Sequence, residues 1–112
     1  MYSRGDVVKG PNPFSSDPAR PYVALSNDTH PFFRNETVYA AVTSTPRSEA
    51  IPITGEDFES GGLPIDPSYA SPWTILTFKH GDILEQEGVL TEETIHRIAR
   101  DAARYVDPNS NP

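Results

Sequence analysis

Twelve prolines interrupt this 112-residue chain and limit what it can fold into. Proline lacks a backbone N–H and breaks a helix interior, so few stretches are long enough to be helical. The runs between the prolines are short and rich in residues that favour extended backbone, such as Tyr22, Val23 and Leu25. Only 36% of the residues are apolar. The pattern predicts one loop-rich, mainly β domain.

The predicted strands are residues 6–9, 21–26, 37–45, 50–54 and 71–79, with a brief further pairing at 82–84. Pro52 cannot donate to a sheet ladder, so its strand is predicted at a sheet edge. Residues 10–18 and 55–67 are predicted as loops because turn-forming residues dominate them.

Helical periodicity is confined to the C-terminal part of the chain. Thr91 is a natural N-cap, and the apolar residues that follow it recur at helical spacing: Ile95, Ile98, Ala99, Ala102 and Val106. We predict a helix over 91–106 that closes a small, strongly bent barrel or sandwich. The domain then covers residues 1–106, and 107–112 is predicted as a disordered tail.

The composition narrows the classes of function. There is no cysteine, which excludes disulfides and thiolate chemistry, and the three histidines lack the spacing of a zinc site, so we expect no metal and no cofactor. A net charge of −7 argues against broad electrostatic binding of nucleic acid, so any RNA contact must be local. The acid-rich, lysine-poor composition suggests a halophilic source.

We find no run of roughly 18 apolar residues that would span a bilayer and no signal-peptide pattern at the N-terminus. The sequence therefore predicts a soluble, cytoplasmic protein.

Four motifs, in this order, resemble the MazF/PemK toxin family, the endoribonucleases of toxin–antitoxin pairs. They are Arg-Gly-Asp-Val-Val at 4–8, Ala-Arg-Pro-Tyr-Val-Ala-Leu-Ser-Asn at 19–27, Ala-Ala-Val-Thr-Ser at 40–44, and the segment 88–98. The resemblance implies a small SH3-like β-barrel with a C-terminal helix, a homodimer and a cognate antitoxin. It also implies metal-independent cleavage of single-stranded RNA, by attack of a 2′-hydroxyl on the adjacent phosphate.

The residues that match the family's catalytic positions are Arg20 and Thr43. A guanidinium offers paired donors to phosphoryl oxygens, and a threonine hydroxyl can donate to the same phosphate or orient the nucleophile. Arginine is a poor general base because its pKa lies far above neutral. We therefore interpret Arg20 as an electrostatic clamp that can also donate a proton to the leaving oxygen.

One segment departs from the family pattern. Where many members carry Cys/Glu-Asp-Gln-x-Arg-Thr, this chain has Ser-Pro-Trp-Thr-Ile-Leu-Thr at 71–77, with neither a carboxylate nor an arginine. The identity of the general base is then open. His80 follows this strand and has a suitable ordinary pKa, although a single histidine after a strand is often incidental.

Three further residues are predicted to contact substrate: Ser44, Arg47 and Trp73. Arg47 either contacts a phosphate or pairs with Glu49. Trp73 either belongs to the core or stacks on an RNA base or an antitoxin side chain. Phe14 either anchors its loop or lines a groove for a partner.

Two functions from different classes follow. The first is a toxin-like, metal-independent endoribonuclease. The alternative is a non-catalytic SH3-like barrel that binds a peptide or single-stranded nucleic acid, because a fold by itself does not determine activity.

Overall fold

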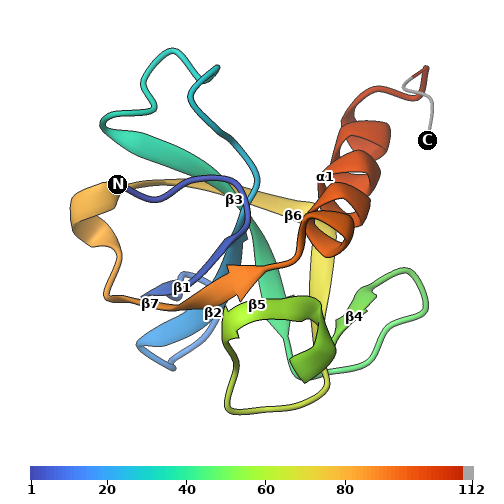
Figure 1. Cartoon of the computed structure of the whole chain (residues 1–112). Helices are drawn as coiled ribbons and strands as arrows, with labels where there is room; N and C mark the ends of the chain where they lie inside the picture. Colours follow the sequence, from blue (N-terminus) through green and yellow to red (C-terminus); the bar gives the residue numbers. More distant parts are fainter. Residues whose placement is uncertain (110–112) are drawn as a thin grey trace.

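A computed structural model describes residues 1–109 of the chain, and in it a single antiparallel sheet curls into a half-barrel (Figure 1). The strands are β1 (Asp6–Pro11), β2 (Ala19–Ala24), β3 (Glu36–Thr43), β4 (Ile51–Ile53), β5 (Phe58–Gly61), β6 (Ser68–Lys79) and β7 (Glu85–Leu90). Their order across the sheet is β4-β6-β3-β2-β1-β7-β5. The helix α1 (Glu92–Val106) follows, and two short 3₁₀ helices cover Gly55–Asp57 and His80–Asp82.

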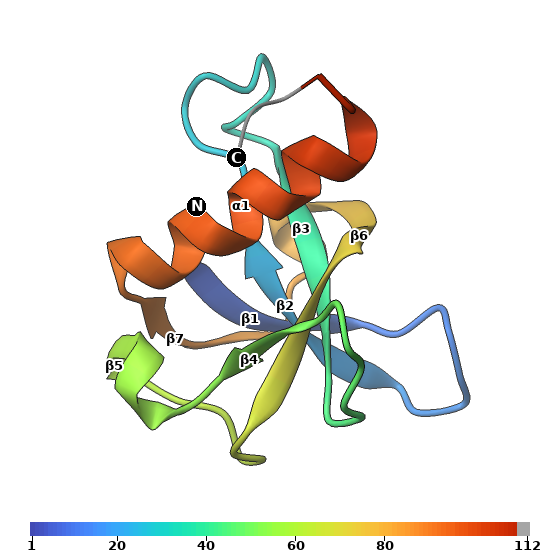
Figure 2. The ribbon, with the colours of Figure 1, turned by 90° about the vertical axis from the view of Figure 1, so that its right-hand side faces the viewer.

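The sheet has a core on each face, because successive side chains of a strand point to opposite sides. On one face Val23, Ala40 and Val42 pack with Ile95 and Ile98 of α1, which runs across the sheet (Figure 2). On the other face the core is aromatic, and it consists of Val8, Tyr22, Ala24, Tyr39, Ala41 and Ile83, with Tyr2, Leu76 and Phe78 against them. Both faces of the central strands are therefore buried.

The prediction of a mainly β fold with one C-terminal helix is confirmed. Helix α1 begins at the predicted cap, where the Thr91 hydroxyl accepts a hydrogen bond from the amide of Thr94. The short strand β4 lies at one edge of the sheet and contains Pro52, as predicted. Phe58 and Leu63 hold the segment 55–67 to the sheet by packing against the core that also contacts α1.

Several predicted boundaries are wrong. Strands β5 and β7 were not predicted, and the loop at 55–67 therefore contains a strand. The brief pairing predicted at 82–84 is a single backbone bond, from the amide of Leu84 to the carbonyl of Lys9, between a 3₁₀ turn and β7. Val106 is 73% exposed, because the buried face of α1 ends at Ala102. Part of the predicted disordered tail, residues 110–112, lies outside the described residues; residues 107–109 form a turn closed by a bond from the Asn109 amide to Asp107.

Within residues 1–109, no helix is long and apolar enough to cross a membrane.

Candidate functional site

Strands β2 and β3 place Arg20 and Thr43 together at one end of the sheet. The two strands pair with Tyr22 opposite Ala41, and continuing this antiparallel register by two residues puts Arg20 opposite Thr43. Tyr22 and Ala41 both belong to the aromatic core, so Arg20 and Thr43 lie on that same face, just beyond its edge.

The guanidinium of Arg20 is held by contacts on several sides. Its Nη2 donates to the carbonyl of Val42 at 2.8 Å, and its Cζ lies 4.9 Å from the centre of the Phe14 ring and 6.0 Å from that of Tyr22. Its Nε is buried and has no hydrogen-bond partner among the described residues. Because Nε is buried, a ligand does not reach it in this conformation. The donors left for a ligand are those of Nη1, which has no hydrogen-bond partner among the described residues.

Tyr22, which lies beneath Arg20, stays a neutral phenol. Burial raises the pKa of Tyr22, and the nearby positive charge of Arg20 offsets only part of that rise. The Tyr22 hydroxyl donates to the carbonyl of Pro11, so it is fully used in supporting the start of the 12–18 loop. Arg20 is therefore the charged group that this aromatic support presents to solvent.

The hydroxyl of Thr43 is oriented by the chain that leaves β3. Its Oγ1 accepts a hydrogen bond from the amide of Thr45 at 3.1 Å. Because a hydroxyl can accept and donate at once, its proton is left to donate to a ligand in the adjoining pocket.

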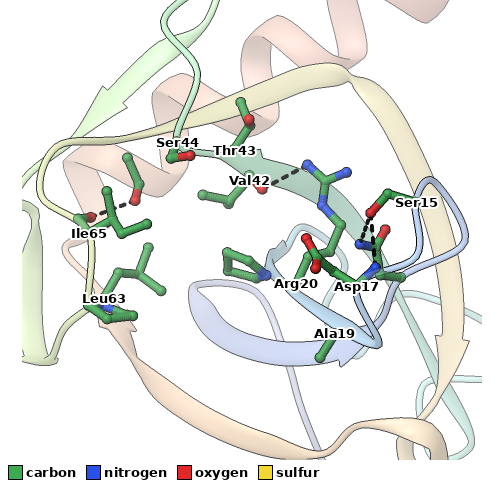
Figure 3. A pocket seen from close by; sticks show the side chains of 13 residues that line it. Ser15, Asp17, Ala19, Arg20, Val42, Thr43, Ser44, Leu63 and Ile65 are labelled. Atoms are coloured by element: carbon green, nitrogen blue, oxygen red, sulfur yellow. Dashed lines mark hydrogen bonds between the residues drawn. The ribbon is translucent and has the colours of Figure 1, made fainter.

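Arg20 and Thr43 line a pocket of about 320 Å³, shown in Figure 3. Arg20 and Asp17 lie on one side of it, Thr43 and Ser44 along the top, and Leu63 and Ile65 opposite. The pocket thus combines a cation, hydroxyls and a carboxylate on one side with an apolar wall on the other. Leu63 and Ile65 come from the connection between β5 and β6, which the sequence did not single out as part of a site.

A second pocket of about 290 Å³ adjoins the first, and Arg20 and Thr43 line both. Its other walls include Phe14, Arg47 and Trp73. Arg47 and Trp73 also border a third depression, of about 510 Å³, together with Tyr105 of α1. Because neighbouring pockets share lining residues, we describe the three together as the groove. The Arg20–Thr43 pair lies where the first and second pockets meet.

Trp73 is not a core residue. It is 38% exposed, and its ring meets Tyr105 edge to face with 6.1 Å between centroids. The side chain is placed outside the core because β3 and β6 shift register between Ala40 and Ala41, where residues 72–74 of β6 bulge out of the ladder. Of the two interpretations of Trp73, a core residue or a residue that contacts a ligand or partner, the geometry allows only the second.

Arg47 does not pair with Glu49. Among the described residues Arg47 has no salt bridge, and the Glu49 carboxylate instead accepts a hydrogen bond from Ser48. The Arg47 side chain is exposed beside the second and third pockets.

His80 does not share the site with Arg20 and Thr43, so the prediction that placed it there is wrong. It follows the end of β6 that pairs with Glu36, and the length of β3 separates that end from Thr43, a path of roughly 23 Å at the usual strand rise. Its Nδ1 accepts from the amide of Tyr2, and its Nε2 lies 2.7 Å from the carbonyl of Phe33. Both ring nitrogens therefore serve to fix backbone segments.

The structure adds a residue that the sequence reasoning missed. Asp17 comes from the 12–18 loop, three positions before Arg20, and lines the first pocket beside it. The only available signal was that an acidic residue lies in the loop leading into the Arg-Pro motif. Within residues 1–109, no cluster of three or more histidine, aspartate or glutamate side chains could hold a metal ion.

This arrangement suits a phosphodiester. A guanidinium with a free donor and a neighbouring hydroxyl can bind two phosphoryl oxygens, and apolar and aromatic walls on either side can take the bases that flank the phosphate.

Neither a family model nor a curated protein sequence matches the chain. Solved structures do match the chain. One is an endoribonuclease in complex with its cognate antitoxin, from a mycobacterial species: it is 19% identical, the alignment covers all of both chains, and the TM-score is 0.70. Another mycobacterial endoribonuclease is 20% identical over 94% of this chain and 90% of that one, with a TM-score of 0.72. The Mycobacterium tuberculosis toxin MazF-mt6 is 21% identical over 88% of this chain and 92% of that one, with a TM-score of 0.66. The fold predicted from the resemblance to MazF/PemK toxins is thereby confirmed.

Proposed function

We propose that the protein is a toxin-like endoribonuclease that cleaves single-stranded RNA. The observation that carries this proposal is the Arg20–Thr43 pair, which lines two adjoining pockets on a fold shared with MazF-type endoribonucleases. Because the RNA itself supplies the 2′-hydroxyl as nucleophile, the reaction needs no metal-activated water and we expect it to proceed in EDTA. DNA has no 2′-hydroxyl and would not be cleaved.

In this mechanism the scissile phosphate lies against Arg20 and Thr43. Attack of the 2′-oxygen forms a bond to phosphorus and builds negative charge on the phosphoryl oxygens, while the bond to the 5′-oxygen breaks. The Nη1 donors of Arg20 stabilise that charge, since a cation that Val42 and Phe14 already hold in place stabilises a transition state more than a mobile one does. The Thr43 hydroxyl donates to the same phosphate.

The neighbouring pockets would hold the nucleotides on either side. Ser44 lies next to Thr43 on the apolar-walled side, and Arg47 and Trp73 lie on the other. We propose that Arg47 contacts a second phosphate and that the exposed face of Trp73 stacks on a base. With RNA as the proposed substrate, we also propose a cytoplasmic location.

We further propose two protein partners. One structural neighbour is an endoribonuclease bound to its cognate antitoxin, and by analogy an antitoxin would inhibit this chain. The other partner is a second copy of the chain. Exposed apolar side chains lie on β6 and on the last turn of α1, at Trp73, Ile75, Tyr105 and Val106, and Trp73 contacts Tyr105. We refer to these four residues as the apolar cluster, and exposed apolar surface of this kind favours self-association.

A second candidate function is a non-catalytic binding module. The observation that favours it is β6, which presents Trp73 and Thr74 to the groove where the resemblance would place an acidic residue. A site with a cation and aromatic walls, but without the acidic residue that the resemblance places on this strand, would bind single-stranded RNA and leave it intact.

The deciding experiment is incubation of the purified protein with a long single-stranded RNA in EDTA, at both ordinary and molar KCl. Arg20→Ala is the test variant. Arg34→Ala is the matched control, because Arg34 stacks on Phe33 as Arg20 stacks on Phe14, and it lines a different pocket.

Discrete products with 2′,3′-cyclic phosphate ends from the wild type and Arg34→Ala, but not from Arg20→Ala, are expected. Tight RNA binding without cleavage by any of the three would favour the binding module.

A further inference from the structure

The first pocket contains one carboxylate, that of Asp17, and its position gives it a chemical role. Arg20 is the other charged residue that lines this pocket, and the remaining lining residues are neutral. Figure 3 shows the two side chains on the same side of the pocket. We propose that Asp17 is the general base that deprotonates the 2′-hydroxyl of the substrate, an inference that rests on the proposed endoribonuclease function.

The loop that carries Asp17 is ordered by bonds of its own. The Asn12 side chain donates to Ser15 Oγ at 2.9 Å and accepts from the amide of Phe14 at 3.0 Å. The Asp17 amide donates to Ser15 Oγ at 3.3 Å, and Phe14 stacks on the Arg20 guanidinium at 4.9 Å. The loop that carries Asp17 is thus ordered and packed against Arg20, and Asp17 lines the same pocket as Arg20.

The carboxylate of Asp17 is also free to react. Among residues 1–109 its oxygens accept no hydrogen bond and form no ion pair, and Arg20 spends its Nη2 on the carbonyl of Val42 instead. The Asp17 carboxylate is therefore open to a hydrogen bond from a substrate hydroxyl.

Binding does not explain a carboxylate at this place. A negative charge beside the site of a phosphodiester repels the substrate and lowers its affinity, so a pocket that only bound RNA would be better without it. Proton transfer does explain it, because the 2′-hydroxyl must lose its proton as its oxygen attacks phosphorus.

The proposed step transfers the proton of the 2′-hydroxyl and exchanges one phosphorus–oxygen bond for another. The Asp17 carboxylate takes the proton of the 2′-hydroxyl, the 2′-oxygen forms a bond to phosphorus, and the bond from phosphorus to the 5′-oxygen breaks. The departing 5′-oxygen takes a proton from a solvent water, and Asp17 returns its proton to solvent. The products are a 2′,3′-cyclic phosphate and a 5′-hydroxyl.

Asp17→Asn tests this role, because it keeps the size of the side chain and removes the basic group. We expect its cleavage rate to fall by about 10² to 10³, within the range usual for a lost general base. Its affinity for a 2′-O-methyl RNA, which cannot be cleaved, should be unchanged or tighter, since the repulsion is gone. Asp28→Asn, an exposed aspartate in the 27–35 turn, is the matched control and should cleave like the wild type.

The pH dependence separates catalysis from a structural effect. With a carboxylate base, the logarithm of the wild-type cleavage rate rises with unit slope through the acid range and then levels. This rise in the acid range, the acid limb of the pH–rate profile, should be absent in Asp17→Asn. It should be present in Asp17→Glu, which restores the base. Circular dichroism and melting temperature establish that each variant is folded.

The possible outcomes separate a failure of the role proposed for Asp17 from a failure of the proposed endoribonuclease function. A wild type that cleaves, with Asp17→Asn within about threefold of it or with an unchanged acid limb, overturns the role of Asp17 and leaves the endoribonuclease standing. A folded wild type that cleaves no RNA at any pH overturns the proposed function, and the role of Asp17 with it.

Discussion

At the scale of the residue, the decisive interaction is the one between Phe14 and Arg20. An arginine at a strand start ordinarily extends into water, but this one lies against an aromatic ring and bonds a carbonyl on the neighbouring strand. The ring is 51% exposed, so it contributes little to the core and acts mainly on the guanidinium. Phe14 therefore restricts the conformations of the Arg20 guanidinium.

Replacing Phe14 by alanine should slow cleavage and weaken RNA binding without unfolding the protein. An exposed cation–π contact contributes about 0.5 to 1 kcal/mol, which corresponds to a change of roughly two- to fivefold. Phe14→Tyr keeps the ring and should behave as the wild type. The comparison is of single-turnover rates and of affinity for 2′-O-methyl RNA. Equal values for Phe14→Ala and the wild type would show that the stacking has no part in the site.

The sequence anticipated some of these residues and missed others for physical reasons. Arg20 and Thr43 follow from motifs at adjoining strand ends, and strand register brings them together. The distance of His80 from them depends on which end of β6 pairs with which end of β3, and this is set by the whole sheet. Asp17 depends on how one loop folds back over its own strand, for which local pattern gives no signal.

At the scale of the element, the join between α1 and the sheet depends on Asp57, at the end of a 3₁₀ turn. Its carboxylate accepts bonds from the amide of Thr54 at 2.8 Å and from the hydroxyl of Thr94 at 2.8 Å, and its own carbonyl accepts from the amide of Thr91. One residue thus links the start of β5 to the first turn of α1.

Asp57→Asn should destabilise the fold by about 1 to 2 kcal/mol at neutral pH, since hydrogen bonds to a charged acceptor are replaced by weaker ones. Burial raises the pKa of Asp57, but the hydrogen bonds from Thr54 and Thr94 and the charge of Arg97 outweigh it and hold that pKa below its ordinary value. The resulting stability is present above the pKa of the unfolded chain and is lost as pH falls through the lower pKa of the folded protein.

Urea unfolding of both proteins over pH about 7 to 3 measures this difference. The gap between the wild type and Asp57→Asn should narrow below about pH 4. A gap that is constant over the whole range would mean that the charge of Asp57 plays no part.

The two unpredicted strands show why element-level patterns fail here. Strands β5 and β7 have the sequences Phe-Glu-Ser-Gly and Glu-Gln-Glu-Gly-Val-Leu, which are acidic and rich in glycine. They pair because their backbones come unusually close: a Cβ added at Gly61 would lie 2.2 Å from the Glu87 carbonyl, and Gly61 has φ of +69°. Glycine, which weakens a strand prediction, is what permits this pairing.

At the scale of the whole molecule, charge and exposed apolar surface act in opposite directions. The chain carries a net charge of −7, and three salt bridges form among the described residues, so self-repulsion opposes association at low salt. Against it stands the apolar cluster at Trp73, Ile75, Tyr105 and Val106. Salt screens the repulsion and leaves the apolar attraction, so association should strengthen with KCl.

If this cluster is the face on which two copies meet, Tyr105→Glu should convert a dimer to a monomer. The substitution places a charge beside Trp73 without touching either core, because Tyr105 is an exposed residue of the last turn of α1. Ala103→Glu changes a neighbouring exposed residue and is the control for one negative charge added on the same turn. Sedimentation velocity at ordinary and molar KCl measures the mass of each.

We expect a wild-type dimer that tightens with salt, a Tyr105→Glu monomer at both salt concentrations, and a control that still dimerises. Cleavage should fall with the dimer, because Tyr105 and Trp73 border the depression that continues the groove from Arg20, and a second copy on this face would complete its wall. A monomeric wild type that cleaves RNA at full rate would show instead that one chain holds the entire site and that the apolar cluster serves another partner.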